Sequence, residues 1–174
     1  MAHYWDILCN NAFGNYRQLL EEVTLSIAMG EFLNTLGNQK EDAATGRLPD
    51  ENYSREVMQL FTIGLQQLNV DGTVVKVNGV PVDTFTQSDV SNLARVFTGY
   101  QADESEGFFD SVVAPSYRVR KVGYTRRRMV LNANRHSMLE ARFLGAVVPA
   151  GTDGAAALKI ALDTLFQHPN VGPF

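Results

Sequence analysis

The chain has 174 residues, of which 45% are hydrophobic and 20% charged, and it carries a formal net charge of −4. This length suits one domain, and the composition is that of a soluble globular protein. No run reaches the roughly 18 apolar residues of a membrane-spanning helix, and the first residues lack the pattern of a signal peptide. We therefore predict no membrane span, and the sequence leaves the localisation open. Cys9 is the only cysteine, so an internal disulfide is excluded.

The charges are unevenly divided along the chain. Residues 1–110 hold 16 acidic and 6 basic residues, whereas residues 111–174 hold 3 acidic and 9 basic ones. Eight of those nine bases lie between Arg118 and Arg142. Such a basic block is typical of an anion or nucleic-acid patch, and the alternative is that it packs against the acidic half of the same chain or lies in water. Because the whole chain is acidic, we predict no nucleic-acid binding.

The first half of the chain predicts three helices. Residues 2–12 can form the first, and Asn15 has the side chain of an N-cap for a second. Apolar residues then follow helical spacing up to Leu36. After a polar loop, Asp50 caps a third helix, which ends at Gly64.

The second half adds a hairpin and two helices. The dipeptides Asp71-Gly72 and Asn78-Gly79 flank a β-branched run, which predicts one small β-hairpin excursion near residues 70–85. "TQSD" at 86–89 is a capping box and opens a fourth helix. Residues 101–150 are irregular, with "RRMVLNA" and "RFLGAVVPAG" as short strands or extended segments, and a last helix follows Asp153. The sequence thus predicts a mainly α fold, with about five amphipathic helices in an orthogonal or bundle-like array that form a single helical domain over residues 1–174.

Four stretches then carry a resemblance to a known family. They are "LPDENYSREVMQLFTIGL", "FTQSDVSNLARVFTGY", "NRHSMLEARFLG" and "LDTLFQHPNVGPF", in this order. With them the chain resembles the large bacterial family catalogued as domain of unknown function eighteen hundred. The resemblance implies a fold but no reaction. Because members of that family are longer and often exported, the chain looks like an internal or truncated piece. In many members an Asp follows His136, where this chain has Ser137.

The third helix carries a cluster of polar side chains beside its apolar stripe. Three interpretations stay open, namely surface ion pairs, a buried polar network, and a site in which Glu56 is the acid or base and Arg55 clamps an anion. We expect Arg55 or Glu56 to be buried and bonded to a residue distant in sequence. His136 is the best single candidate for a pocket residue, with a structural hydrogen bond as the alternative. The candidate catalytic residues are Glu56, Arg55 and His136, and the candidate binding residues are Asn52, Arg128 and Arg135.

Two functions of different classes follow from these observations. In the first, the chain is a helical scaffold or binding segment of a larger cell-envelope or exported protein. In the second, it is a hydrolase-like enzyme, an esterase or similar, with a polar site around Arg55, Glu56 and His136. No metal-binding pair of histidines and no cofactor fingerprint is present, so no metal or cofactor is predicted. As partners we expect either the remaining segments of the full-length protein or a second copy. The contact residues for self-association would be Leu158, Leu162, Leu165, Phe166 and Phe174.

Overall fold

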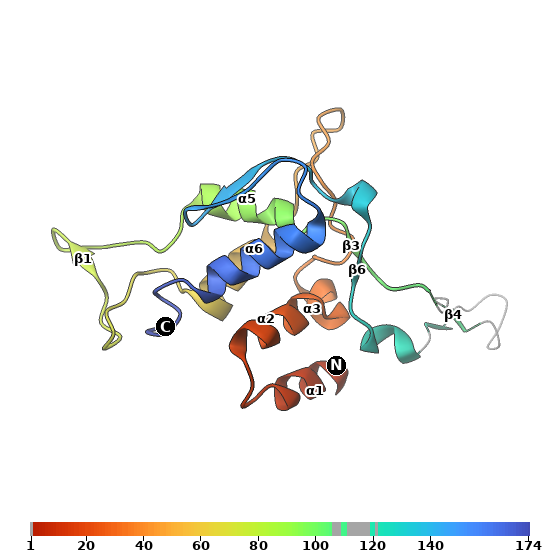
Figure 1. Cartoon of the computed structure of the whole chain (residues 1–174), viewed down its shortest axis with the longest axis horizontal. Coiled ribbons are helices and arrows are strands. Elements are labelled where there is room, and N and C mark those ends of the chain that lie inside the picture. Colours follow the sequence, from red (N-terminus) through yellow and green to blue (C-terminus); the bar gives the residue numbers. More distant parts are fainter. Residues whose placement is uncertain (1, 106–108, 111–118, 121) are drawn as a thin grey trace.

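The computed structural model describes residues 2–105, 109–110, 119–120 and 122–174. Arg118 and Lys121 of the basic block lie outside the described residues. Six α-helices are present in the described part of the chain, together with four two-stranded antiparallel sheets. The predicted mainly α fold with a single hairpin is therefore wrong, because the protein is mixed α/β (Figure 1). The α-helices are α1 (Ala2–Asn10), α2 (Tyr16–Thr24), α3 (Ile27–Phe32), α4 (Asn52–Glu56), α5 (Gln87–Val96) and α6 (Gly154–Phe166).

The strands are short and pair in antiparallel fashion. The segments that the sequence marks as short strands or extended do contain strands, but one of these strands pairs with a partner far along the chain, Leu131 opposite Tyr100. Such a partner leaves no local signature in the sequence, which is why the strand content is greater than predicted. The pairs are β1 (Lys76–Val77) with β2 (Val80–Pro81), β3 (Tyr100–Gln101) with β6 (Val130–Leu131), β4 (Phe109–Asp110) with β5 (Val119–Arg120), and β7 (Ala141–Phe143) with β8 (Ala146–Val148).

Helix starts follow the local capping chemistry. The side chain of Asn15 accepts a hydrogen bond from Gln18 N at the start of α2. The side chain of Asp153 accepts hydrogen bonds from Ala155 N and Ala156 N at the start of α6. Thr86 and Asp89 form the full capping box of α5. These three predicted starts are confirmed. Two short 3-10 helices, η2 (Val122–Arg126) and η3 (Ala133–Arg135), lie in the region predicted to be irregular.

The second and third predicted helices are each divided. The second is interrupted between α2 and α3, where Ser26 forms an isolated β-bridge with Arg128. The third begins as α4 and continues as a π-helix, η1 (Val57–Thr62). In η1 the Thr62 hydroxyl donates to the Val57 carbonyl at 2.6 Å, and Gly64 follows with a positive φ of 68°. A π-helical segment widens the turn and shifts the faces of the helix relative to an α-helix.

Helices α5 and α6 pack against each other at the centre of the molecule (Figure 1). The β7–β8 hairpin packs on both of them, and α2 packs on α6. Tyr53 of α4 is fully buried, with its ring edge-on to Phe97 at 4.8 Å between centroids and its hydroxyl 2.6 Å from Thr24 Oγ1. One apolar core thus joins the helices from both halves of the chain.

Residues 65–84, called the arm below, project from this body (Figure 1). Asn78 and Gly79 connect β1 to β2 with positive φ angles of 53° and 82°, as a two-residue hairpin turn requires. The predicted hairpin is confirmed. Its base is closed by the hydrogen bond from Thr84 N to the Leu65 carbonyl at 3.0 Å.

The apolar face of α6 lies inside the molecule. Leu162 and Leu165 are fully buried against the rest of the chain, so these two leucines cannot form the predicted contact with a second copy, whereas Leu158 is 7% exposed. Phe166 and Phe174 stay 37% and 54% exposed. Self-association itself remains a prediction. Among the described residues, the helices fall short of the length and apolarity that a membrane crossing demands.

Candidate functional site

The polar cluster of the third predicted helix joins α4 to α5. The Glu51 carboxylate accepts hydrogen bonds from Ser91 Oγ at 2.6 Å, Gln87 Nε2 at 2.8 Å and Arg55 Nη2 at 3.0 Å. The bond from Ser91 is the main reason that the pKa of Glu51 lies below its usual value. Arg55 also donates to Gln87 at 3.1 Å, so it has the expected distant partner. However, its side chain is 39% exposed and not buried.

The other candidates on this helix take no part in the network. Glu56 is half-buried and makes none of the side-chain hydrogen bonds found among the described residues. Asn52 is exposed, and its backbone N–H donates to Asp50 Oδ1 at 2.8 Å. The network therefore ties two helices together through Glu51, which is not among the candidate residues predicted from the sequence.

His136 is 2% exposed and follows η3. Its Nδ1 lies 3.0 Å from the Thr98 carbonyl oxygen, which makes Nδ1 the protonated nitrogen. His136 lines a cavity of about 10 Å³ together with Arg95 and Ser137, and this space suffices for about one water molecule. Neither Arg55 nor Glu56 lines this cavity. The geometry thus gives His136 the structural hydrogen bond that was the alternative interpretation.

Ser137 is bonded to Glu41, a residue that is not among the candidates predicted from the sequence. Its hydroxyl donates to the Glu41 carboxylate, with oxygen distances of 2.8 and 3.0 Å, and its backbone N–H donates to Thr98 Oγ1 at 2.9 Å. A hydroxyl can donate to Glu41, whereas an Asp at this position would place a second carboxylate there.

Two bases of the basic block, Arg127 and Arg128, pair with the acidic half of the chain. Arg128 lies 3.4 Å from Glu22 and 3.7 Å from Glu21, and Arg127 lies 3.5 Å from Asp103. For these residues the intramolecular alternative is confirmed. Arg135 is exposed on η3, and its carbonyl oxygen accepts a hydrogen bond from Lys40 N at 2.9 Å. That the chain binds no nucleic acid remains a prediction.

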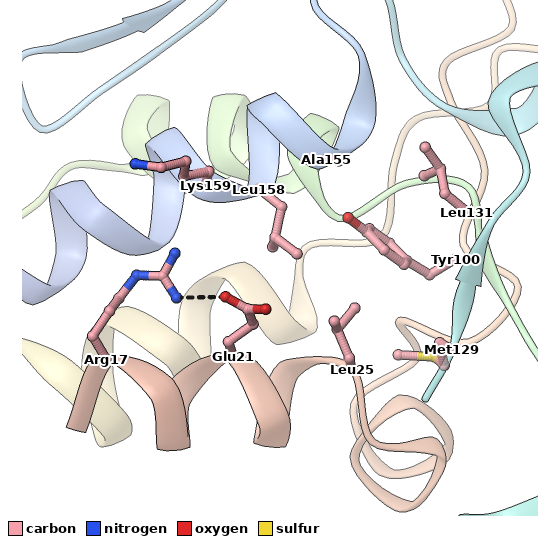
Figure 2. A pocket seen from close by; sticks show the side chains of 9 residues that line it. All are labelled: Arg17, Glu21, Leu25, Tyr100, Met129, Leu131, Ala155, Leu158 and Lys159. Carbon is pink, nitrogen blue, oxygen red and sulfur yellow. Dashed lines mark hydrogen bonds and ion pairs between the residues drawn. The ribbon is translucent and has the colours of Figure 1, made fainter. Parts of the chain in front are cut away.

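An open cleft of about 410 Å³ lies between α2 and α6, with β3 and β6 at one end (Figure 2). None of the residues predicted to form a site lines it. The i, i+4 spacing of Arg17, Glu21 and Leu25 places these three side chains on one face of the α2 segment, and the sequence shows this much. The opposite wall of the cleft comes from distant segments, so the sequence does not reveal the cleft. It is lined by Arg17, Glu21, Leu25, Tyr100, Met129, Leu131, Ala155, Leu158 and Lys159.

Charged side chains form one end of this cleft. Arg17 donates from Nε to Asp163 at 2.7 Å and from Nη1 to Glu21 at 2.9 Å. Lys159 donates to the other oxygen of Asp163 at 2.6 Å. Burial by itself would raise the pKa of Asp163, but the hydrogen bonds from Lys159 and Arg17 outweigh it and hold this pKa below its usual value. Two basic and two acidic side chains thus meet at this end of the cleft.

Tyr100 occupies the other end. Burial is the main cause that raises the pKa of its phenol, and the negative charges of Glu21 and Asp153 add to it, so the hydroxyl stays protonated. This hydroxyl lies 3.4 Å from the Gly154 carbonyl, a long distance for an O–H donor. The cleft thus offers a weakly used hydroxyl, an apolar wall and a balanced set of charges. Among the described residues no group of three His, Cys, Asp or Glu side chains could hold a metal ion.

The fold and the cleft define a mixed α/β protein with an open cleft between α2 and α6. The family model described as "Protein of unknown function (DUF1800)" matches residues 1–174, so the chain belongs to this family. The resemblance inferred from the four sequence stretches is thereby confirmed. No curated protein and no solved structure matches the chain.

Proposed function

We propose that the chain is a binding segment of a larger cell-envelope or exported protein, and that the cleft between α2 and α6 is its binding site. The observation that carries the proposal is the cleft itself. Its volume of about 410 Å³ falls within the range of about 300–1,000 Å³ that is usual for ligand pockets. Ligand pockets combine apolar walls with a few polar groups that fix orientation. Leu25, Leu131 and Leu158 supply such a wall here, and Arg17 and Tyr100 supply polar groups at its two ends (Figure 2).

The hydrolase-like alternative has less support. It needs Arg55, Glu56 and His136 to face one substrate. Arg55 is bonded to Glu51 and Gln87, and the cavity beside His136 has room for about one water molecule. A binding role makes no such demand, and the cleft meets its requirements with other residues.

Methionine methyl groups provide the test. Met129 lines the cleft, Met58 is fully buried in the core, and Met29 lines a separate apolar hollow beside Phe32. With ¹³C-methyl-methionine labelling, a short probe that carries an isobutyl group should shift the Met129 signal in a saturable way and leave Met58 unchanged. A response at Met29 instead would place binding in the other hollow and would contradict the proposal.

Two variants sharpen this experiment. Ala155 is an exposed residue of α6 that lines the cleft, so Ala155→Phe should fill the cleft and abolish the Met129 response without disturbing the core. Ala44→Phe adds the same ring at an exposed position that does not line the cleft and should bind the probe like the parent. If no probe shifts the Met129 methyl signal at concentrations up to the solubility limit of the probe, the proposed function is refuted.

A further inference from the structure

We infer that the cleft accepts an uncharged peptide segment with a large apolar side chain, and that Arg17 and Glu21 together recognise a peptide group of that segment. This inference rests on the proposed function, because it names the chemistry of the ligand for the same cleft.

The balance of charge argues against a charged ligand. Arg17, Glu21, Lys159 and Asp163 form a chain of ion pairs in which Asp163 has both oxygens occupied, one by Arg17 Nε and the other by Lys159 Nζ. The two positive and two negative groups cancel. A carboxylate placed beside Arg17 would also lie beside Glu21, and an ammonium group beside Glu21 would also lie beside Arg17. Attraction to one group is therefore offset by repulsion from its neighbour.

The unused hydrogen-bonding capacity of the same pair suits an amide. Arg17 is 17% exposed, and its Nη2 makes none of the side-chain bonds found among the described residues, so two N–H donors remain at the cleft. Within the described part of the chain, Glu21 Oε1 has only the long contact of 3.7 Å with Arg128 Nη1. A donor and an acceptor thus stand next to each other. A peptide group presents the complementary pair, a carbonyl acceptor and an N–H donor.

The far end of the cleft offers a second polar contact. Figure 2 shows Tyr100 across the cleft from Arg17, with its hydroxyl turned toward Leu158, which lies between them. Because its bond to the Gly154 carbonyl is long, this hydroxyl can instead donate to a ligand carbonyl. Two polar ends separated by an apolar wall match a short peptide, in which an apolar side chain lies between two peptide groups. A fatty acid has only one polar end, and that end is charged.

Three probes with the same isobutyl group separate these cases. N-acetyl-leucine N-methylamide is neutral and has two amides, N-acetyl-leucine is a carboxylate, and leucine N-methylamide is an ammonium ion. In titrations followed at Met129, the neutral probe should bind about tenfold more tightly than either charged one. Equal affinity for all three, or a preference for the carboxylate, would overturn the inference and would leave the binding function of the cleft intact. Failure of all three would refute the function as well.

Two charge variants test the recognising pair directly. Arg17→Gln leaves the cluster with an excess negative charge, so the ammonium probe should gain affinity relative to the carboxylate probe. Glu21→Gln leaves an excess positive charge and should reverse that order. Lys76→Gln, at an exposed position on the arm, lowers the net charge of the chain by one, as Arg17→Gln does, and should leave the order of the parent unchanged. If the cleft recognised only the apolar side chain of the probe, the parent and the three variants would all bind the probes in the same order of affinity, which would contradict the inference.

Discussion

Replacing Asn170 should destabilise the protein more than any exposed asparagine does, because this side chain fastens the base of the arm to the end of η1. Asn170 is 3% exposed and lies after α6. Its Nδ2 donates to the carbonyls of Ile63 at 2.6 Å and Gln66 at 2.9 Å, and its Oδ1 accepts from Leu68 N at 2.7 Å. One buried amide thus satisfies three backbone groups of a distant segment.

The magnitude follows from these three bonds. A typical hydrogen bond contributes about 1 kcal/mol net, so Asn170→Ala should lower the free energy of unfolding by about 3 kcal/mol. In a domain of this size each kcal/mol lowers Tm by roughly 2–4 °C, which gives a loss of about 6–12 °C. Calorimetry measures this loss. Asn134→Ala, at an exposed position on η3, is the matched control and should change stability by less than about 0.5 kcal/mol.

A second substitution separates the donor bonds from the acceptor bond. Asn170→Asp keeps an oxygen for Leu68 N but turns a carboxylate oxygen toward the two carbonyls. At neutral pH it should be at least as destabilising as Asn170→Ala. In acid the protonated Asp can donate again, so its deficit relative to the parent should shrink. If Asn170→Ala unfolded within one degree of the parent, the three bonds would not have the role assigned to them.

Two further predictions concern other positions. Gly99 has a φ of 87°, and a Cβ added there would lie 2.9 Å from the Asn132 carbonyl oxygen. Gly46 also has a positive φ, but the space around it is open, so Gly46→Ala should lower the free energy of unfolding only by the conformational cost of about 1–2 kcal/mol. Gly99→Ala should therefore lower the free energy of unfolding in urea clearly more than Gly46→Ala does, and equal losses would contradict the close packing. Burial lowers the pKa of His168 below its ordinary value of 6.5, and its Nδ1 accepts from Asn170 N at 3.1 Å. Because the unfolded chain then takes up this proton first, stability should fall as pH drops through about 6.5 toward the lower folded value, and His168→Gln should flatten that part of a Tm–pH profile; identical profiles would show that His168 does not contribute.

Local chemistry explains which parts of the fold the sequence predicts. Asn15, Thr86 and Asp153 mark helix starts because the cap and its partner lie within three residues of each other. The turn at Asn78-Gly79 is predicted for the same reason, since two neighbouring residues with positive φ define it. Such features need no information from the rest of the chain.

The missed features all depend on distant partners. Pairing of Tyr100 with Leu131 and bridging of Ser26 to Arg128 bring together segments whose own sequences are too short to show a strand period. The candidate site is missed for the same reason. Arg17 looks like half of an ordinary i, i+4 surface pair until α6 brings Asp163 beside it.

The arm departs from the body and returns to it at nearly the same point, and this bears on how the protein can vary. Leu65 and Thr84 are joined by a backbone hydrogen bond, and Gln67 N donates to the Val82 carbonyl just beyond it. Doubling the length of a closed loop costs only about 0.6 kcal/mol in chain entropy. Residues inserted at the exposed tip between Asn78 and Gly79 should therefore leave the core and the cleft as they are. The arm is the place where this fold can accept an epitope or a fluorescent label.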